Sequence, residues 1–388
     1  MTWEVKTLDQ ISENLDSKRV PITKNIRRNG SIPYYGASGI VDYVEEYIFD
    51  EDLLLVSEDG ANLLARTYPI AFSISGKTWV NNHAHVLRFK DKISQKFVEL
   101  YLNSIKLADF VSGMAQPKLN QAMLNKIPIP FPPLSEQKRI VAILNKSFES
   151  ITRAKENAEK NLNNAKEIFE SYLQSVFENK GEGWEEKKLG EVCEIKPQKS
   201  EARTKLKETD HVSFVPMEDL GINQKMLIPT KERTLKEVEG SYTYFANGDV
   251  LLAKITPCFE NGKLGIAEKL KNSIGFGSSE YIVFRANKDL FSEFLYYFLL
   301  RSQFRVEGAK RMMGAVGHKR VSKEFIEQSE IYLPSLKEQQ SIVKKLDKLS
   351  IETKNLGAIY EKKLADLEEL KKSILQKAFN GKLTEVSA

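Results

Sequence analysis

The phrase PPLSEQKRIVAIL occupies residues 132–144, and PSLKEQQSIVKKL occupies residues 334–346, 202 positions later. The segment that follows repeats as well, because LQSVF at 173–177 returns as LQKAF at 375–379 with the same offset. Self-similarity over such a length, without insertion or deletion, indicates a duplicated structural unit. We therefore predict that the chain is built from two copies of one unit.

The repeat extends over the whole chain. Three further pairs of phrases match, namely WEVKTLDQISE (3–13) with WEEKKLGEVCE (184–194), FDEDLLLVS (49–57) with ANGDVLLAK (246–254), and HVLR (85–88) with IVFR (282–285). The last two pairs share an offset of 197 residues. We predict a variable domain, a helix, a second variable domain and a second helix at residues 1–133, 134–183, 184–334 and 335–388. A third domain would begin where the chain stops, so we expect two units that close on each other about a pseudo two-fold axis, with Met1 near Ala388.

The repeated helices carry apolar side chains every seven residues. In the first helix these are Leu144, Ile151, Ala158, Ala165 and Tyr172, with a second row of Phe148, Leu162, Phe169 and Val176. In the second helix the row is Leu346, Thr353, Tyr360, Leu367 and Ile374, with a second row of Leu349, Leu356 and Leu370. Two such rows predict a coiled coil. The alternative is a pair of amphipathic helices packed on different bodies.

Both variable domains mix strand and helix patterns. Short apolar runs bounded by turn residues predict strands within 49–60, 84–89, 249–255 and 280–286. Longer apolar segments predict helices within 96–111 and 290–306. Each domain is therefore expected to be of mixed α/β class.

The composition points to a globular protein of the cytoplasm. The longest apolar runs, such as LYYFLL at 295–300, are too short to span a bilayer, and the N-terminus has no basic-then-apolar leader. Cys193 and Cys258 cannot form a disulfide framework and lie in no metal-binding pattern. A net charge of +5 permits binding to nucleic acid without requiring it.

No catalytic motif is complete. FPPL at 131–134 lacks the Asp or Asn with which an adenine methyltransferase holds the amino group, and the spacing of GAVGHKRVS at 314–322 is wrong for a P-loop. SEDG at 57–60 lacks the following Lys of a nuclease site and reads as a turn. His83 and His85 would share one face of a strand, but no third ligand is in view. We predict neither a catalytic residue nor a metal site.

Four loops combine small turn residues with side chains that suit DNA. They are RRNGSIPYYGASGIV at 27–41, WVNNHAH at 79–85, GMAQPKLNQ at 113–121 and GAVGHKRVS at 314–322. Arg and Lys bind phosphate and guanine, and Asn and Gln bind adenine. The candidate DNA-binding residues are Arg27, Arg28, Tyr34, Tyr35, Lys77, Asn81, Asn82, His83, His85, Gln116 and Lys118 in the first domain, and Lys254, Ser278, Ser279, Lys310, Arg311, His318, Lys319 and Arg320 in the second. The alternative for each loop is a solvated turn.

These phrases resemble those of a known family, the specificity subunits of type I restriction-modification systems. The two spacer phrases resemble its central conserved regions, and IPYYGASGIV, SEDGAN and WVNNHAHVLR are similar to phrases of its target-recognition domains. The second domain lacks the IPYYGASG and NNHAH phrases. The two half-sites of the DNA target are therefore expected to differ.

The resemblance implies two α/β target-recognition domains separated by two long antiparallel coiled-coil helices. Each domain would recognise one half of a split double-stranded DNA sequence. The chain itself would be non-catalytic and hold no cofactor. Its partners would be two methyltransferase subunits that bind S-adenosylmethionine, together with restriction and translocation subunits. We expect no membrane partner. The alternatives are a coiled-coil scaffold whose domains bind proteins without recognising DNA, and a self-contained nuclease or methyltransferase.

Overall fold

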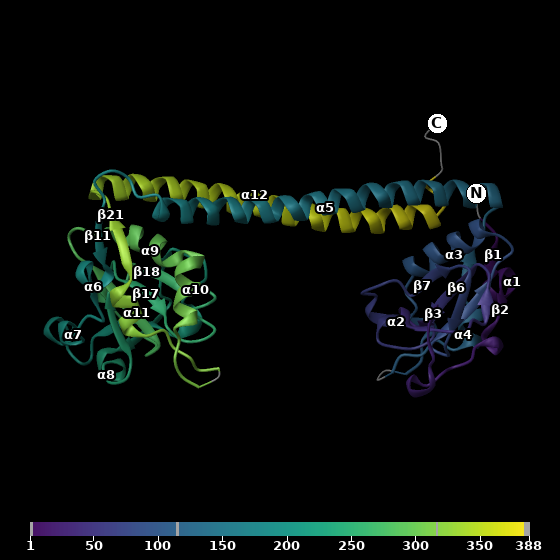
Figure 1. Cartoon of the computed structure of the whole chain (residues 1–388), viewed down its shortest axis with the longest axis horizontal. Helices are drawn as coiled ribbons and strands as arrows, with labels where there is room; N and C mark the ends of the chain where they lie inside the picture. Colours follow the sequence, from purple (N-terminus) through teal and green to yellow (C-terminus); the bar gives the residue numbers. More distant parts are fainter. Residues whose placement is uncertain (1–2, 114–115, 316, 384–388) are drawn as a thin grey trace. The chain divides into compact units, whose positions relative to one another are not determined.

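The computed structural model describes residues 3–113, 116–315 and 317–383 (Figure 1). The chain forms two compact units, of which the first holds residues 1–159 and 361–388 and the second holds residues 160–360. The end of the chain thus returns to the unit in which the chain starts, as a closed pair of repeats predicts. Met1 and Ala388, expected to be neighbours, lie outside the described residues. Trp3 and Gly381 lie close together, because a Cβ on Gly381 would be 3.6 Å from the indole ring.

The first unit contains an α/β domain with two four-stranded sheets. Their strand orders are β2-β9-β6-β7 and β4-β3-β8-β5, and β1 and β10 form a separate pair. The strands are β1 Val5–Thr7, β2 Glu13–Asn14, β3 Asn29–Gly36, β4 Gly39–Val44, β5 Phe49–Asp50, β6 Leu53–Ser57, β7 Ala71–Ile74, β8 Lys77–Val80, β9 Ala84–Arg88 and β10 Pro128–Pro130. The helices are α1 Leu8–Ile11, α2 Asn62–Ala65, α3 Lys92–Ser104 and α4 Gln121–Asn125.

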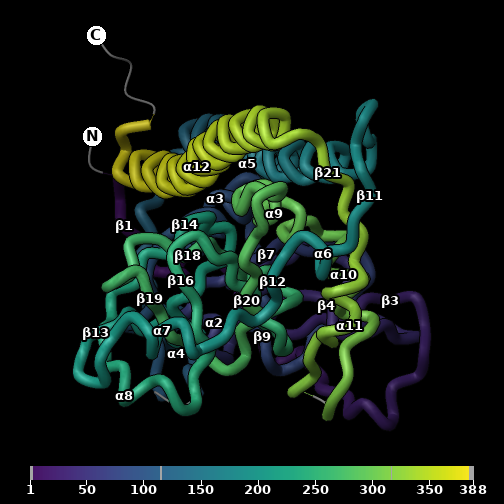
Figure 2. The backbone as a smooth tube through the Cα atoms, turned by 90° about the vertical axis from the view of Figure 1, so that its left-hand side faces the viewer, coloured from purple at the N-terminus to yellow at the C-terminus, as the bar shows by residue number. Residues whose placement is uncertain are grey.

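The α/β domain of the second unit repeats this topology. Its sheets have the orders β12-β20-β17-β18-β14 and β15-β13-β19-β16, and β11 pairs with β21. The strands are β11 Glu185–Lys188, β12 Cys193–Ile195, β13 His211–Val215, β14 Met226–Leu227, β15 Lys231–Thr234, β16 Thr243–Ala246, β17 Val250–Ala253, β18 Leu264–Ala267, β19 Ile274–Gly277, β20 Tyr281–Ala286 and β21 Glu330–Leu333. The helices are α6 Leu189–Val192, α7 Ser200–Lys205, α8 Leu235–Val238, α9 Ser292–Leu300, α10 Ser302–Lys310 and α11 Lys323–Gln328. Helix α9 lies between α12 (Leu336–Phe379) and the five-stranded sheet (Figure 2).

The central strand of each domain is buried on both faces. Leu54 and Val56 of β6 pack with α3 in one core, whereas Leu53 and Leu55 pack with Val80 in another. An apolar run without alternation is what a strand covered on both sides requires. The strands predicted within 49–60, 84–89, 249–255 and 280–286 are confirmed as β6, β9, β17 and β20.

The strand pairing corrects the predicted alignment of the two copies by one residue. Leu54 pairs with Leu87 of β9, and Val250 of β17 pairs with Phe284 of β20. Leu87 and Phe284 correspond through the HVLR and IVFR phrases, so Leu54 corresponds to Val250 and not to Leu251 as predicted. A slip of one residue in a strand exchanges its two faces, so the error would have misplaced every side chain of the strand.

Two long helices follow the α/β domains, α5 (Leu134–Glu178, 45 residues) and α12 (Leu336–Phe379, 44 residues). Inside the first unit, Leu144 near the start of α5 shares a core with Ala378 at the end of α12. Inside the second unit, Leu173 near the end of α5 shares a core with Leu346 near the start of α12. The helices therefore pack together in antiparallel directions, as Figure 1 shows.

The predicted heptad describes most of α5 but not its end. Leu144, Ile151, Ala158 and Ala165 are all buried, whereas Tyr172 is 38% exposed and Leu173 is fully buried. An α-helix has 3.6 residues per turn, so a straight helix drifts away from a seven-residue repeat. The prediction for Tyr172 was wrong for this reason.

In α12 the first predicted row is buried at one position and half-buried at the others. Leu346 is fully buried, and Tyr360, Leu367 and Ile374 are half-buried. Part of the second row faces solvent, because Leu356 is 37% and Leu370 is 47% exposed. Those two positions were wrongly assigned to the helix interface.

The predicted domain helices are shorter than their apolar segments. The segment 96–111 ends its helix at Ser104, and the segment 290–306 divides into α9 and α10 at Arg301. Arg301 is extended (φ −54, ψ 135), and its guanidinium lies over the rings of Phe177 and Phe298. Within the residues that the structure describes, no helix is long and apolar enough to cross a membrane.

Candidate nucleic-acid interface

Three segments of the first domain meet at the carboxyl end of β6. Glu58 N donates to His83 O at 2.9 Å, which joins the end of β6 to the turn before β9. Leu119 N donates to Glu58 O at 2.8 Å, and Gly60 N donates to Pro117 O at 3.0 Å. Main-chain hydrogen bonds thus hold three sequence-distant loops at one place.

The second domain makes the same three hydrogen bonds. Lys254 N donates to Glu280 O, Val321 N donates to Lys254 O, and Thr256 N donates to Lys319 O, each at 2.9 Å. Lys254 is therefore the counterpart of Glu58, and Glu280 is the counterpart of His83. The loop cluster at the end of the central strand is a conserved feature of the two copies, although its side chains differ.

A basic residue closes each cluster, at the position of Lys118 in the first domain and Arg320 in the second. Each of the two forms isolated β-bridges with the neighbouring loops. The side chain of Lys118 is 54% exposed and that of Arg320 is 45% exposed. These two cations occupy equivalent places and are accessible to a ligand.

The acidic partner of the cation comes from different loops in the two domains. Lys118 Nζ lies 3.2 Å from Glu58 Oε1, at the end of the central strand. Arg320 binds Glu280 through two hydrogen bonds, at 2.7 and 2.9 Å, in the turn before β20. The charge at the strand end is thus negative in the first domain and, at Lys254, positive in the second. The two clusters therefore share the same main-chain hydrogen bonds but present different patterns of charge to a ligand.

The pKa shifts follow from these contacts. Burial would raise the pKa of Glu58, but the hydrogen bond from Arg19, the charge of His85 and the contact with Lys118 together lower it. The hydrogen bond from Arg320 lowers the pKa of Glu280. Burial lowers the pKa of Lys254, and Arg320 adds to this effect while Glu280 opposes it.

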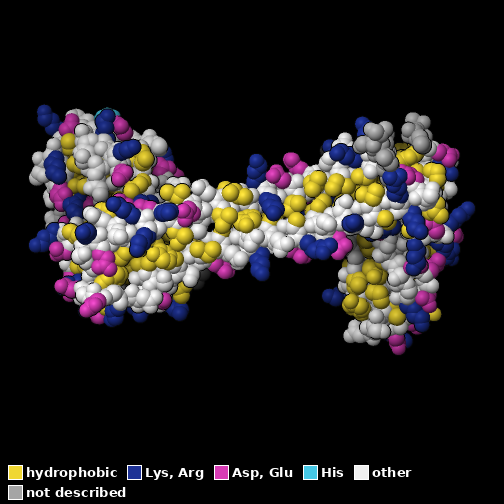
Figure 3. All heavy atoms as spheres, turned by 90° about the horizontal axis from the view of Figure 1, so that it is seen from above, with side chains coloured by type: hydrophobic (Ala, Val, Ile, Leu, Met, Phe, Trp, Pro, Cys, Tyr) yellow, Lys and Arg dark blue, Asp and Glu magenta, His cyan; other side chains and the backbone are white. Residues whose placement is uncertain are grey.

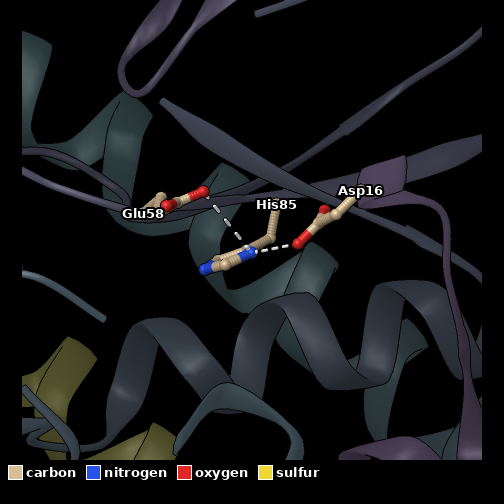
Figure 4. A group of neighbouring side chains, drawn as sticks. All are labelled: Asp16, Glu58 and His85. Atoms are coloured by element: carbon tan, nitrogen blue, oxygen red, sulfur yellow. Dashed lines mark hydrogen bonds and ion pairs between the residues drawn. The ribbon is translucent and has the colours of Figure 1, made fainter. Parts of the chain in front are cut away.

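A buried ionic network supports the cluster of the first domain (Figure 4). His85 is 1% exposed, and its Nδ1 lies 2.5 Å from Asp16 Oδ2 while its Nε2 lies 2.7 Å from Leu119 O. Both ring nitrogens face acceptors, which is the hydrogen-bonding pattern of the doubly protonated ring. Burial would raise the pKa of Asp16, but the hydrogen bond and charge of His85, the hydrogen bond from Val86 N and the charge of Arg19 together lower it. The network fixes β9 against the segment after β2.

The same network contains the one group that has metal-ligand chemistry among the described residues. One ligand atom each from Asp16, Glu58 and His85 lies within 4.8 Å of the others. Arg19 already binds Glu58 at 2.6 Å and Asp16 at 3.4 Å, so a cation of the chain occupies this place. His83 does not join the group, because it binds Asp59 at 2.7 Å.

Part of the predicted loop 27–41 supports the domain from inside. Tyr34 is 1% exposed, and the Arg27 guanidinium stacks on its ring at 4.3 Å and binds Asp42 at 2.9 Å. Arg28 is 82% exposed on its side chain. Tyr35 packs beside Phe72. Arg28 is therefore the accessible cation of this loop.

The remaining candidates lie in varied surroundings. Asn81 is buried and accepts a hydrogen bond from His83 N, whereas Asn82 is exposed and Lys77 lies over the Tyr47 ring. Gln116 is exposed and follows residues 114–115, which lie outside the described part of the loop.

In the second domain, Ser278, Ser279 and His318 lie beside the Lys254 cluster. Lys254 Nζ donates to Ser279 O, the Ser278 hydroxyl accepts from Glu280 N, and Arg320 donates to His318 O. Residue 316 of the same loop is outside the described residues. Lys310 and Arg311 end α10, and Arg311 lies over the Phe325 ring, so it is engaged with α11.

Asp16, Arg19, Glu58 and Glu280 were not predicted as site residues. SEDG was interpreted as a turn, and Gly60 does adopt a left-handed backbone (φ +108) there. The signal that could have identified Glu58 is its place directly after the buried strand, opposite a basic loop residue. Arg19 and Asp16 are 39 or more residues from the groups they bind on β9 and after β6, and no local pattern marks them.

A duplicated α/β domain combined with paired long helices, and carrying one charged loop cluster per copy, defines a two-site architecture. A family profile described as type I restriction modification DNA specificity domain matches residues 1–163 and 181–368, and the chain belongs to this family. The chain is 28% identical over 360 residues to a putative type I restriction enzyme specificity subunit, S.HindORF215P, of Haemophilus influenzae, covering 91% of this chain and 89% of the relative.

Two solved structures share the fold. The first, described as "Structural basis underlying complex assembly and conformational transition of the type I R-M system", superposes with a TM-score of 0.69 at 20% identity and covers 98% of both chains. The second, the HsdS subunit from Thermoanaerobacter tengcongensis, has a TM-score of 0.59 at 20% identity and covers 98% of this chain and 97% of that chain.

Proposed function

We propose that the chain is the non-catalytic specificity subunit of a type I restriction-modification complex, and that each α/β domain recognises one half of a bipartite double-stranded DNA target. The domains would comprise residues 1–133 and 184–334, with spacer helices at 134–183 and 335–388. The observation that carries the proposal is the doubled loop cluster, which has one backbone frame and two charge patterns. Loop clusters that have the same backbone arrangement but different side chains suit recognition of two different half-sites.

The proposed DNA contacts are the accessible candidates in the two loop clusters and elsewhere on the two domains. They are Arg28, Lys77, Asn82, His83, Gln116 and Lys118 in the first domain, and Lys254, Ser279, Lys310, His318, Lys319 and Arg320 in the second. Lys and Arg would set the register on the phosphates, and the amide and guanidinium groups would select bases. Tyr34, Asn81 and His85 are buried and would not contact DNA. They would hold the loops in place from inside the domain.

The partners would be methyltransferase subunits that bind S-adenosylmethionine, and restriction subunits. The description of a related structure refers to complex assembly of the type I R-M system, and this supports the assignment. Figure 3 shows hydrophobic side chains along α5 and α12 on the face in view. Ile168, Ile351 and Ile359 on these helices are 51 to 62% exposed, which suits a protein surface. Because the helices repeat, we propose two methyltransferase subunits.

Exchange of residues 1–133 for the same segment of another family member tests the proposal. The hybrid, expressed with the methyltransferase partner, should methylate a motif in which one half is new and the other is unchanged. Methylation-aware sequencing of the host genome gives both halves. A change in both halves would contradict recognition by two independent domains.

The alternative is a protein-binding scaffold that does not recognise DNA, and the exposed apolar side chains of α5 and α12 are the observation in its favour. Filter binding of the purified chain to a DNA duplex over a salt series separates the two. The DNA-binding proposal expects affinity that falls steeply with salt, because bound cations are released from the phosphates. A chain without measurable affinity in low salt, alone and with its methyltransferase partner, would favour the scaffold.

A further inference from the structure

The first domain has a groove beside the start of α5. It has a volume of about 1200 Å³ and lies between the first strand and helix, the β9–α3 connection and the PPLSEQ phrase. Trp3, Ile11, Phe89, Phe131 and Leu134 contribute apolar lining. The charged lining residues are Glu4, Glu13, Asp91, Lys6, Arg88 and Lys90, which balance in sign and do not favour a polyanion.

Gln137 is one of the residues that line this groove, and within the part of the chain that the structure describes only one of its two polar side-chain atoms has a hydrogen-bond partner. The side chain is 1% exposed, and its Nε2 donates to Pro132 O at 2.8 Å. No donor among the described residues reaches Oε1. Buried polar atoms are nearly always paired with protein or with water, so Oε1 can accept a hydrogen bond from a donor that the described residues do not supply.

The second domain shows how the counterpart of Gln137 is used. Gln339 occupies the same position of the repeated phrase, and its Nε2 donates to Pro334 O and to Asp289 O, each at 2.9 Å. Phe291 N donates to Gln339 Oε1 at 2.8 Å. The side-chain amide thus pairs with the main chain on both sides of Leu290, whose side chain is 4% exposed in the core.

The first domain lacks this internal partner because its helix begins earlier. Ser94 stands 197 positions before Phe291, the offset that relates β9 to β20. Asp91 caps α3 and accepts from Ser94 N at 2.8 Å, so this N–H is not available to Gln137. Ser94, which stands in place of the phenylalanine, has a smaller side chain and lines the groove.

We propose that the groove binds an extended peptide segment of a protein partner. The Gln137 amide would pair with the main chain of the segment, with Nε2 donating to one carbonyl and Oε1 accepting an N–H two residues later. Apolar side chains of the segment would occupy the space that Phe291 fills in the second domain. The two halves of the chain differ here, because the second half supplies this segment from its own sequence and the first half takes it from outside.

A peptide with the sequence NKDLFSE, which copies residues 287–293, is the probe. Fluorescence anisotropy of the labelled peptide with the full-length chain should show saturable binding. Methylation of the peptide nitrogen of its phenylalanine removes the proposed donor and should weaken binding by about tenfold, the effect of one hydrogen bond to a buried group. Methylation of its lysine nitrogen is the matched control and should have a much smaller effect. Absence of saturable binding, or equal loss with both methylated peptides, would overturn the proposal.

A pair of variants assigns the binding to one half of the chain. Gln137→Met keeps the shape of the side chain and should weaken peptide binding by about tenfold, whereas Gln339→Met should leave it unchanged. Circular dichroism checks that both variants are folded, and the methylated peptides keep the test valid if either variant is not. If Gln137→Met changed the sedimentation of the chain alone and left peptide binding intact, the groove would be an interface between two copies and the proposal would be wrong.

Discussion

At the scale of the residue, the two domains carry different charges at a place where their main-chain hydrogen bonds are the same. Glu58 and Lys254 follow the same buried strand and make the same main-chain bonds, yet they carry opposite charges. In the first domain the negative charge is compensated by Arg19 and Lys118. In the second, Lys254 donates to Ser279 O, and Arg320 is compensated by Glu280 from another loop. A half-site preference that resides in such positions can change without any change of fold.

Replacement of Lys118 or Arg320 by alanine should weaken DNA binding uniformly across sequences. Each variant removes one accessible cation, so the slope of log affinity against log salt should become shallower by about one. Filter binding over a salt series measures the slope. Lys348→Ala is the control, because that lysine is 78% exposed on α12 and should leave the slope unchanged. Equal slopes for all four proteins would remove these two residues from the interface.

Asp16→Asn should lower the free energy of unfolding of the first domain by about 3 kcal/mol, because it leaves His85 buried without its carboxylate. Chemical denaturation at neutral pH measures this loss. Asp16 has a lowered pKa in the folded chain, so its contribution is complete above its ordinary pKa of 3.8 and is lost as the pH falls through the lower folded value. The difference between the two proteins should therefore shrink below about pH 4. A constant difference down to pH 2 would contradict an ionised Asp16.

At the scale of the element, the end of α5 does not keep the seven-residue repeat. Its buried side chains follow the 3.6-residue period of a straight α-helix. The apolar repeat places Tyr172 inside, but Leu173, Phe177 and the half-buried Phe169 pack on the core of the second domain. These residues are four apart, which suits packing of one helix face on a globular body. The end of α5 is thus part of a domain core more than of a coiled coil.

Neighbouring alanine substitutions at the end of α5 test this arrangement. Leu173→Ala should cost about 2 to 5 kcal/mol of stability, because Leu173 is fully buried among aromatic side chains. Tyr172→Ala should cost less than about 0.5 kcal/mol, as is usual for exposed positions. Denaturant titration of the two variants gives the comparison. The reverse order would restore the simple heptad.

At the scale of the whole molecule, both long helices begin in one compact unit and end in the other. Each therefore depends on two cores, and a change of length in one helix must be matched in the other to keep the packing in register. Under the proposed function, the lengths of α5 and α12 together set the number of base pairs between the two half-sites.

Insertion of four residues into both helices, near Asn157 and Ile359, should lengthen the unread spacer of the methylated motif and leave both half-sites unchanged. The same insertion in α5 alone should abolish methylation, because the paired faces lose their register. Methylation-aware sequencing measures both outcomes. An unchanged spacer in an active complex with both insertions would show that the helices do not set it.

Much of the fold could be predicted because its signals are local. The duplication is visible in PPLSEQKRIVAIL and PSLKEQQSIVKKL, the buried strands in runs such as LLLVS, and the long helices in their apolar repeats. The candidate site could be predicted in part, since Lys118 and Arg320 were identified as basic residues of glycine-containing loops and Lys254 was also named as a candidate. Arg19, Asp16 and Glu58 could not be identified, because their roles depend on contacts between segments that are distant in the chain.

The sequence by itself determined that there are two copies, where the two long helices lie, and that the copies differ in their loops, because composition and periodicity act within one segment. Only the tertiary structure decided the matching of Leu54 with Val250, the turn of α5 toward Leu173, and the unpaired oxygen of Gln137. Each of these depends on which other segment of the chain lies beside the residue. Strand register, helix packing and hydrogen-bond pairing are all properties of two segments together. For the same reason, Gln137 and Gln339 have different hydrogen-bond partners although they occupy the same position of the repeated phrase.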